Sequence, residues 1–178
     1  MATTQTGKSK SSTKSKTTSR AKSGEKDAIQ LLKADHREVE KMFADFEKTN
    51  GAVTKSKLAE QICLALKVHT QIEEEIFYPA AREALSDEDM IDEAVVEHAA
   101  AKDLIGEIEM MDVGEDLFDA KVKVLSEQIE HHVEEEEKEM FPKLQKTDMD
   151  MRALGLRMAE RKTELMSSLA RPNGQRVQ

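Results

Sequence analysis

The sequence predicts an all-α protein: an up-down-up-down four-helix bundle with an extra C-terminal helix and a disordered basic N-terminal tail. Strong helix formers dominate the 178 residues, whereas Gly occurs 7 times, Pro 3 times and aromatic residues make up 3%. Apolar residues recur at spacings of three and four, which is typical of helices with one buried face. Charge also divides the chain, because residues 1–26 carry +6 and the remainder −15 of a net −9.

Residues 1–25 form the predicted tail, which is rich in Lys, Ser and Thr and almost free of apolar side chains. Such a segment cannot bury enough surface to offset its chain entropy, so disorder is expected. The simpler interpretation is a solubilising tail. The alternative is a weak, nonspecific contact with nucleic acid, because a cationic coil binds phosphate without sequence preference.

Targeting signals are not predicted. The basic N-terminus is not followed by an apolar segment, and no apolar run approaches the roughly 18 residues of a transmembrane helix. A cytoplasmic location is therefore expected. The single cysteine, Cys63, excludes an intrachain disulfide and is expected to be a small buried residue.

Residues 26–146 are predicted to form the bundle. Each of its four helices has one seam of regularly spaced residues that faces the interior. The seams are Ile29, Leu32, His36, Val39, Phe43 and Phe46; Leu58, Ile62, Leu66, His69, Glu73 and Ile76; Ile91, Ala94, His98, Ala101, Ile105 and Ile108; and Phe118, Val122, Leu125, Ile129, His132 and Glu136.

The turn residues predict where these helices end. Asn50 and Gly51 tolerate left-handed backbone and should end the first helix, and Gly114 should close the third. Pro79 should kink the last turns of the second helix. Residues 147–178 are predicted to hold an outer helix, from about 148 to 169, and a short tail. The short loops that force neighbouring helices together are expected near 50–53, 85–87 and 112–115.

Polar residues interrupt the apolar seams. Each seam has one histidine where an apolar residue is expected, and two seams have a glutamate four residues later. A single buried histidine is usually a hydrogen-bonded core residue. Six buried polar groups need another explanation, because each costs a few kcal/mol when it is unpaired.

The six residues are predicted to meet in one layer. His36 lies 15 residues before the turn at Gly51 and His69 lies 18 after it; His98 lies 16 before Gly114 and His132 lies 18 after it. At about 1.5 Å per residue, these depths agree to within about one helical turn. The predicted metal ligands are therefore His36, His69, Glu73, His98, His132 and Glu136.

An internal repeat indicates two half-sites. His69 is followed by Glu73 at +4 and Pro79 at +10, and His132 is followed by Glu136 and Pro142 at the same distances. The chain thus consists of two copies of one helical hairpin, and each copy contributes a His and a His-x3-Glu motif. A symmetric pair of half-sites suits two metal ions.

The donor types narrow the choice of metal. Imidazole and carboxylate without thiolate favour iron, manganese or zinc over calcium or magnesium. Two glutamates on different helices can bridge ions about 3.5–4 Å apart. With an oxo or hydroxo bridge, the set fills about ten of the twelve positions of two octahedral ions. Two ions of iron, manganese or zinc are therefore expected, and the open positions can bind O2, peroxide or another small ligand.

The ordered set of motifs resembles the hemerythrin family, in its HHE cation-binding branch, over roughly residues 27–145. The motifs are Asp35-His36-Arg37, His69-x3-Glu73 with Phe77-Tyr78-Pro79, Glu97-His98, and His132-x3-Glu136 with Phe141-Pro142. The resemblance implies a non-haem, oxo-bridged di-iron site that binds O2 or responds to redox state, iron or NO. Lys102 stands where classical oxygen carriers have a second histidine in the third helix, which argues against a simple reversible oxygen carrier.

Three functions remain open at this point. The first is a di-iron protein for O2 binding, iron storage, or redox or NO sensing. The second is an enzyme that decomposes peroxide or oxidises a small substrate at the same centre. The third is a stress protein whose metal only staples the bundle and whose basic tail binds nucleic acid.

Several polar residues near the seams are assigned away from the centre. Glu40, four residues after His36, is interpreted as a solvated charge rather than an extra ligand. His131 points about 100° away from His132 on the same helix, so it is predicted to flank the site. The glutamates at 74–75, 134–135 and 137 are expected to form solvated faces.

Overall fold

The computed structural model describes Met1 and residues 26–85 and 89–169, and every regular element in these ranges is helical. The predicted all-α class is confirmed. The tail predicted for residues 1–25 lies outside the described part of the chain. No described helix is long and apolar enough to span a bilayer.

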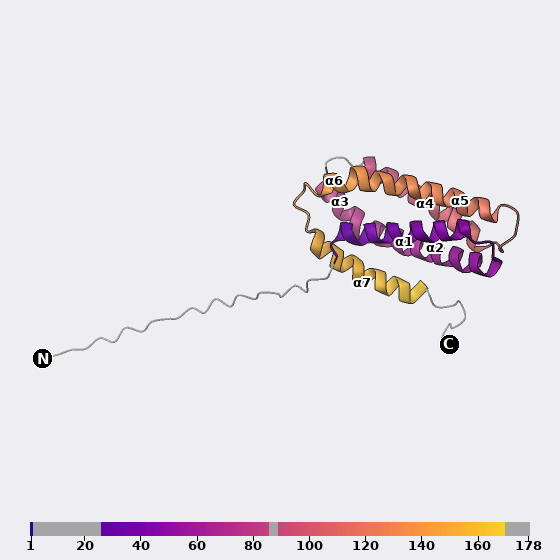
Figure 1. The fold of residues 1–178 in the computed structure, drawn as a ribbon. Coiled ribbons are helices and arrows are strands. Elements are labelled where there is room, and N and C mark those ends of the chain that lie inside the picture. The colour runs from indigo at the N-terminus through magenta and orange to yellow at the C-terminus, as the bar shows by residue number, and fades with distance from the viewer. Residues whose placement is uncertain (2–25, 86–88, 170–178) are drawn as a thin grey trace, which may run out of the picture.

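Four long helices lie side by side and form the body of the protein (Figure 1). Helix α1 packs along α2 and α4 packs along α5, while α2 also contacts α4 and α1 also contacts α5. Each helix therefore has two neighbours, and their apolar faces meet in a common interior. Their bounds are Ala28–Lys48 for α1, Ala52–Ile72 for α2, Asp89–Glu109 for α4 and Phe118–Glu135 for α5.

The ends of α1 differ from the prediction. Its start is fixed by a capping box, in which the Asp27 side chain accepts a hydrogen bond from the Gln30 backbone and the Gln30 side chain accepts one from the Asp27 backbone. The helix ends at Lys48 because Thr49 adopts an extended conformation. Gly51 has a φ of −83° and precedes α2, so the predicted left-handed stop at Asn50-Gly51 was wrong.

The connection between α4 and α5 is longer than predicted. Helix α4 ends at Glu109, and Gly114 adopts a φ of +100° within the following loop instead of closing the helix. Met111 and Val113 pack against the core from this loop. Their burial draws the chain away from the helix axis before Gly114 is reached.

Both proline-containing helices pass through a wide π turn. Helix α2 continues as η1 (Glu73–Phe77) and α3 (Tyr78–Ala84), and α5 continues as η2 (Glu136–Met140) and α6 (Phe141–Leu144). Because proline lacks an N–H and clashes with the carbonyl four residues earlier, the π turn absorbs the misfit without ending the helix. The feature predicted as a kink at Pro79 is thus a π turn before it.

The apolar interior consists of two clusters at different depths. One includes Leu32, Ile72 and Phe141, and the other includes Phe43 and Leu125. His36 and His98 lie between members of the two clusters along α1 and α4, so apolar packing borders the polar layer on both sides. Cys63 is buried in the second cluster, as predicted.

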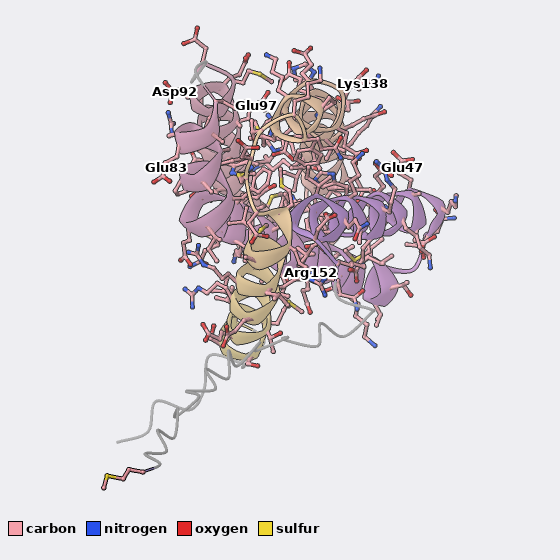
Figure 2. All side chains as sticks on the ribbon, turned by 90° about the vertical axis from the view of Figure 1, so that its left-hand side faces the viewer. Glu47, Glu83, Asp92, Glu97, Lys138 and Arg152 are labelled. Carbon is pink, nitrogen blue, oxygen red and sulfur yellow. The ribbon has the colours of Figure 1, made fainter. Side chains whose placement is uncertain are left out.

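Helix α7 (Met151–Leu169) lies outside the four-helix body and packs against α1, α2 and η1 (Figure 2). Leu154, Met158 and Leu165 are buried on the face of this helix that packs against the bundle. A Cβ atom at Gly155 would lie 2.6 Å from the backbone carbon of Asp27. Only glycine therefore permits this close approach to the start of α1.

Candidate metal centre

The structure brings all of the predicted ligands together in the interior. Four histidines and two glutamates come from the four long helices and the first residues of the two π turns, and all are buried. Their functional atoms form overlapping groups that can hold metal ions. These residues are His36, His69, Glu73, His98, His132 and Glu136.

The histidines form two pairs. His36 Nε2 lies 3.2 Å from His69 Nε2, and His98 Nε2 lies 3.1 Å from His132 Nε2. The first pair comes from the α1–α2 hairpin and the second from the α4–α5 hairpin. The repeat in the sequence thus appears in space as two half-sites, and all four Nε2 atoms point inward.

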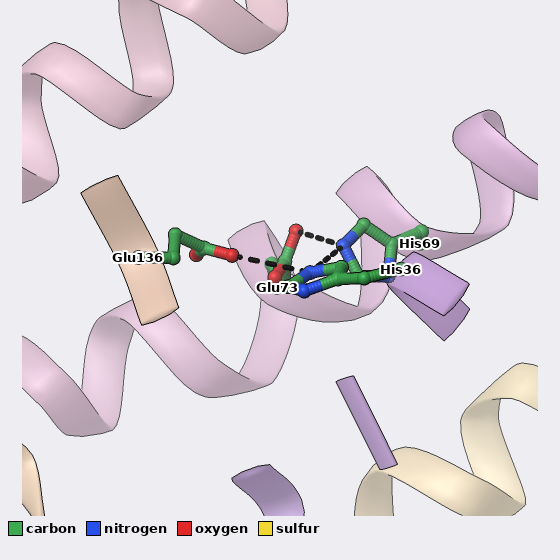
Figure 3. A group of neighbouring side chains, drawn as sticks. All are labelled: His36, His69, Glu73 and Glu136. Atoms are coloured by element: carbon green, nitrogen blue, oxygen red, sulfur yellow. Dashed lines mark hydrogen bonds and ion pairs between the residues drawn. The ribbon is translucent and has the colours of Figure 1, made fainter. Parts of the chain in front are cut away.

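Each glutamate lies between the two half-sites. Glu73 Oε2 is 3.2 Å from His69 Nε2 and 3.4 Å from His98 Nε2. Glu136 Oε2 is 3.4 Å from His36 Nε2 and 3.8 Å from His132 Nε2. Figure 3 shows the first histidine pair with both carboxylates directed toward it. Either carboxylate therefore lies within reach of histidines from both half-sites.

Unpaired buried oxygens show that this donor set fits metal ions. Among the residues that the structure describes, both carboxylate oxygens of Glu73 and Oε2 of Glu136 make no hydrogen bond, although histidine nitrogens lie nearby. A buried, unpaired carboxylate is strongly unfavourable. Cations at this position would compensate the charges of Glu73 and Glu136, and the inward lone pairs of the imidazoles would complete the coordination.

A second layer of carboxylates contacts all four imidazoles and accepts hydrogen bonds from three of them, and sequence reasoning missed this layer. The Nδ1–H groups of His36, His98 and His132 lie 2.9, 3.0 and 2.7 Å from carboxylate oxygens, whereas His69 Nδ1 lies 3.6 Å from its partner. Such partners fix the tautomer that leaves Nε2 free to bind metal. The carboxylates paired with His36, His69, His98 and His132 are, in that order, Glu137, Asp35, Glu74 and Glu97.

Two of these partners correct the prediction of solvated glutamate faces. The Glu74 and Glu137 side chains are only 30% and 17% exposed and contact histidines of the opposite hairpin. Each directly follows a predicted ligand, Glu73 or Glu136. The pattern of a Glu after each bridging Glu was available in the sequence, but the π turns that rotate the side chains were not.

Three of the four outer carboxylates are paired with a basic side chain. Lys162 Nζ of α7 donates to Asp35 at 2.6 Å, and Lys102 Nζ donates to both oxygens of Glu74 at 2.5 and 2.6 Å. Arg37 donates to Glu137. Lys102, where classical oxygen carriers have histidine, thus holds an outer carboxylate in place.

Glu97 is the exception among the outer carboxylates. Within the described residues, no Lys or Arg nitrogen lies within 4.0 Å of its carboxylate. Its neighbours are His132 on the inside and His131 on the outside. The four outer carboxylates are therefore not equivalent.

Aromatic side chains at equivalent positions also differ between the half-sites. Tyr78 and Phe141 each precede the proline of their hairpin. Phe141 stacks on His36, whereas the Tyr78 hydroxyl donates to Glu136 Oε1 at 3.0 Å and lies 3.3 Å from His98 Nε2. Tyr78 is thus a further polar member of the site that the seam pattern did not reveal.

Burial and mutual charge shift the protonation of the cluster. Burial lowers the pKa of His69, but the charge of Glu73 and the contact with Asp35 raise it further, to about 10. Burial and the neighbouring His132 lower the pKa of His98 to about 2. Burial and the charge of Glu136 raise the pKa of Glu73. Some groups of the metal-free site therefore carry protons, and bound ions would displace these protons.

An apolar cavity of about 60 Å³ adjoins the four histidines. Val39, Leu66 and Val68 contribute to its walls, and Lys162 and Met166 of α7 also line it. A space of this size suits one or two very small molecules rather than an organic substrate.

The residues assigned away from the centre lie outside it. Glu40 is 43% exposed and pairs with Arg37, so it is not part of the buried cluster. His131 is 62% exposed and contacts Glu135. The predicted helical register of the fourth helix, with His132 inward and His131 outward, is confirmed.

Comparison with known proteins agrees with this geometry. The family model for the hemerythrin HHE cation binding domain matches residues 27–144, so the chain belongs to this family and is a metal-binding, hemerythrin-like protein. A crystal structure of a hemerythrin HHE cation binding domain-containing protein from Mycobacterium kansasii has the same fold, with a TM-score of 0.71 and 23% identity over 84% of this chain and 95% of that chain. No curated protein matches the sequence.

Proposed function

We propose that this chain is a non-haem di-iron protein that binds a very small ligand such as O2 or NO. The ligands are His36, His69, Glu73, His98, His132 and Glu136. The observation that carries the proposal is the position of the two buried carboxylates, each of which lies between histidines of different half-sites. A single ion would leave one histidine pair unused.

The protein's contribution is to hold and protect the centre. The outer carboxylates orient the imidazoles, and Tyr78 donates a hydrogen bond to Glu136. Ions held by these six residues would supply redox chemistry at coordination positions that the side chains leave open. The apolar cavity beside the histidines admits small uncharged molecules and keeps larger ones out.

The adjacent cavity favours ligand binding over a purely structural metal. A metal that only staples the bundle needs no space beside its ligands, whereas the centre here borders a cavity of about 60 Å³. Iron storage and redox sensing use the same two-ion site and remain within the proposal. Peroxide decomposition is the enzymatic alternative for the same cavity.

Iron loading followed by metal analysis and visible spectroscopy tests the proposal. We expect about two irons per chain and a visible charge-transfer band after exposure to air. One ion or fewer per chain at saturation would overturn the di-iron assignment, and a colourless chain that retains zinc would favour a structural metal. Rapid peroxide turnover by the loaded protein would favour the enzyme.

A further inference from the structure

A second cluster of metal-binding side chains lies on the surface between α4 and α5. His131 Nε2 is 3.3 Å from Glu135 Oε1 and 3.8 Å from Glu97 Oε1. One ligand atom from each of these residues lies within 4.8 Å of the others, which is close enough for a single ion. None of the three belongs to the six-residue buried centre.

The charge around this cluster is not balanced. The other outer carboxylates, Asp35, Glu74 and Glu137, are each paired with a Lys or Arg, whereas Glu97 is not. Glu93 and Glu139 add further negative charge near Glu135. A cation at this position would give Glu97 the counter-charge that the other outer carboxylates already have.

A small groove is lined by residues of both sites, although His131 is not among them. Glu93, Glu97, Glu135 and Glu139 line a cavity of about 40 Å³ whose walls also include His132 and Glu136. Glu136 is 1% exposed, and its Oε2 makes no hydrogen bond within the described residues, although it lies 3.4 Å from His36 Nε2. The groove therefore has four carboxylates among its walls and includes two ligands of the centre.

Glu97 lies at the junction of the two sites. Its Oε2 accepts the hydrogen bond of His132 Nδ1 at 2.7 Å, while its Oε1 faces His131. An ion at the surface would thus bind Glu97 directly. An ion in the centre would be linked to the same carboxylate through the imidazole of His132. This arrangement suits a transfer position better than an independent structural site.

We propose that Glu97, His131 and Glu135 form an exposed receiving site for a divalent transition-metal cation, from which the ion passes along the acidic groove to the buried centre. The histidine nitrogen and carboxylate oxygens suit Fe²⁺, Mn²⁺, Co²⁺ or Zn²⁺. Weak binding is expected, because the site has few ligands and lies open to water. The transfer step rests on the proposed metal centre, whereas the surface site does not.

The test uses the full chain and the variant His131→Gln/Glu135→Gln, which leaves Glu97 and every buried ligand intact. Glu127→Gln is the control, because it removes one negative charge from the same helix outside the cluster, about 6 Å from His131 and about 12 Å from Glu135 along the helix axis. Circular dichroism should show equal helicity for all three proteins. Iron analysis at saturation should give them the same final content.

Cobalt titration measures the surface site. Iron-loaded wild type and Glu127→Gln should bind one further Co²⁺ per chain, and the double variant should not. The metal-free double variant should also lack the weak Co²⁺ site that metal-free wild type has. The surface site can therefore be tested even if the buried centre holds no iron. Equal cobalt binding by wild type and the double variant would overturn the site.

The rate of iron uptake measures the transfer. At low ionic strength, the metal-free double variant should take up iron into its buried centre roughly tenfold more slowly than the wild type. The rate for Glu127→Gln should be close to that of the wild type. Loss of the cobalt site with an unchanged rate of iron uptake would overturn the transfer role. Failure of all three proteins to retain iron would refute the proposed buried centre instead.

Discussion

The two helical hairpins provide nearly the same inner ligands but surround them differently. At the half-site of the first hairpin, Phe141 from the second hairpin stacks on His36, and Lys162 of α7 holds Asp35. At the half-site of the second hairpin, the hydroxyl of Tyr78 from the first hairpin lies beside His98, and Glu97 lies next to the exposed His131. The repeated residues define where ions bind, whereas the unrepeated ones decide which half-site is covered and which is open.

The largest effect should follow removal of an inner histidine. His69→Ala and His132→Ala each delete one ligand of a pair, so each variant should lose at least half of its bound iron. His131→Ala should retain most of the metal because its side chain lies outside the centre. Metal analysis after loading checks all three, and retention of full iron by His132→Ala would contradict the assigned ligands.

The protonation of His69 should make the stability of the metal-free protein depend on pH. The pKa of His69 is raised to about 10, so its contribution is complete below the unfolded value of 6.5 and is lost as the pH rises toward 10. Denaturant unfolding of the metal-free protein should therefore show stability falling across this range by a few kcal/mol. His69→Gln should remove most of this slope, and an unchanged slope would show that another group titrates.

The docking of α7 beside the first half-site can be tested by a substitution at Gly155. A Cβ atom there would lie 2.6 Å from the backbone of α1, so Gly155→Ala should destabilise the protein by about 2 kcal/mol through overpacking. Gly106 in α4 has no atom within 4 Å of an added Cβ. Gly106→Ala is thus the matched control and should be neutral or stabilising by up to about 1 kcal/mol. Equal unfolding midpoints for the two variants would exclude tight docking of α7.

The basic partners of the outer carboxylates allow the two sides of the centre to be compared directly. Lys162→Met frees Asp35, and Lys102→Met frees Glu74. Each carboxylate would then orient its histidine less firmly, so metal affinity should fall about tenfold in each variant. Competition with a chelator measures the change. If only Lys102→Met lowered the metal affinity, the contact between Lys162 of α7 and Asp35 would have no influence on the centre.

The smallest effect should come from making the two aromatic positions alike. Tyr78→Phe removes the hydroxyl that donates to Glu136 and places phenylalanine in both hairpins. Burial and nearby carboxylates raise the pKa of Tyr78 well above its usual value, so the hydroxyl acts as a neutral donor. The variant should keep its iron and lose about 1 kcal/mol of metal-free stability. Loss of an iron on metal analysis would instead identify Tyr78 as a ligand.

The sequence alone determined the helical class and the residues of the central cluster. The seam of each helix shows which face is buried, and a His in this seam stands out because the preceding seam residue, three or four positions earlier, is apolar. The repeated distances from His69 to Pro79 and from His132 to Pro142 also determined the pairing of the half-sites. The helical register that separates His131 from His132 came from the same periodicity.

Only the tertiary structure decided the outer carboxylates, their basic partners and the path to the surface. His36 and Glu137 are 101 residues apart, and Asp35 and Lys162 are 127 apart. Helical periodicity assigns a face within one helix, but it does not determine which polar side chains of two helices meet. The π turns add a further rotation that the period of an α-helix does not contain. For that reason Glu74 and Glu137 were expected in solvent, whereas packing brings both to the histidines of the opposite hairpin.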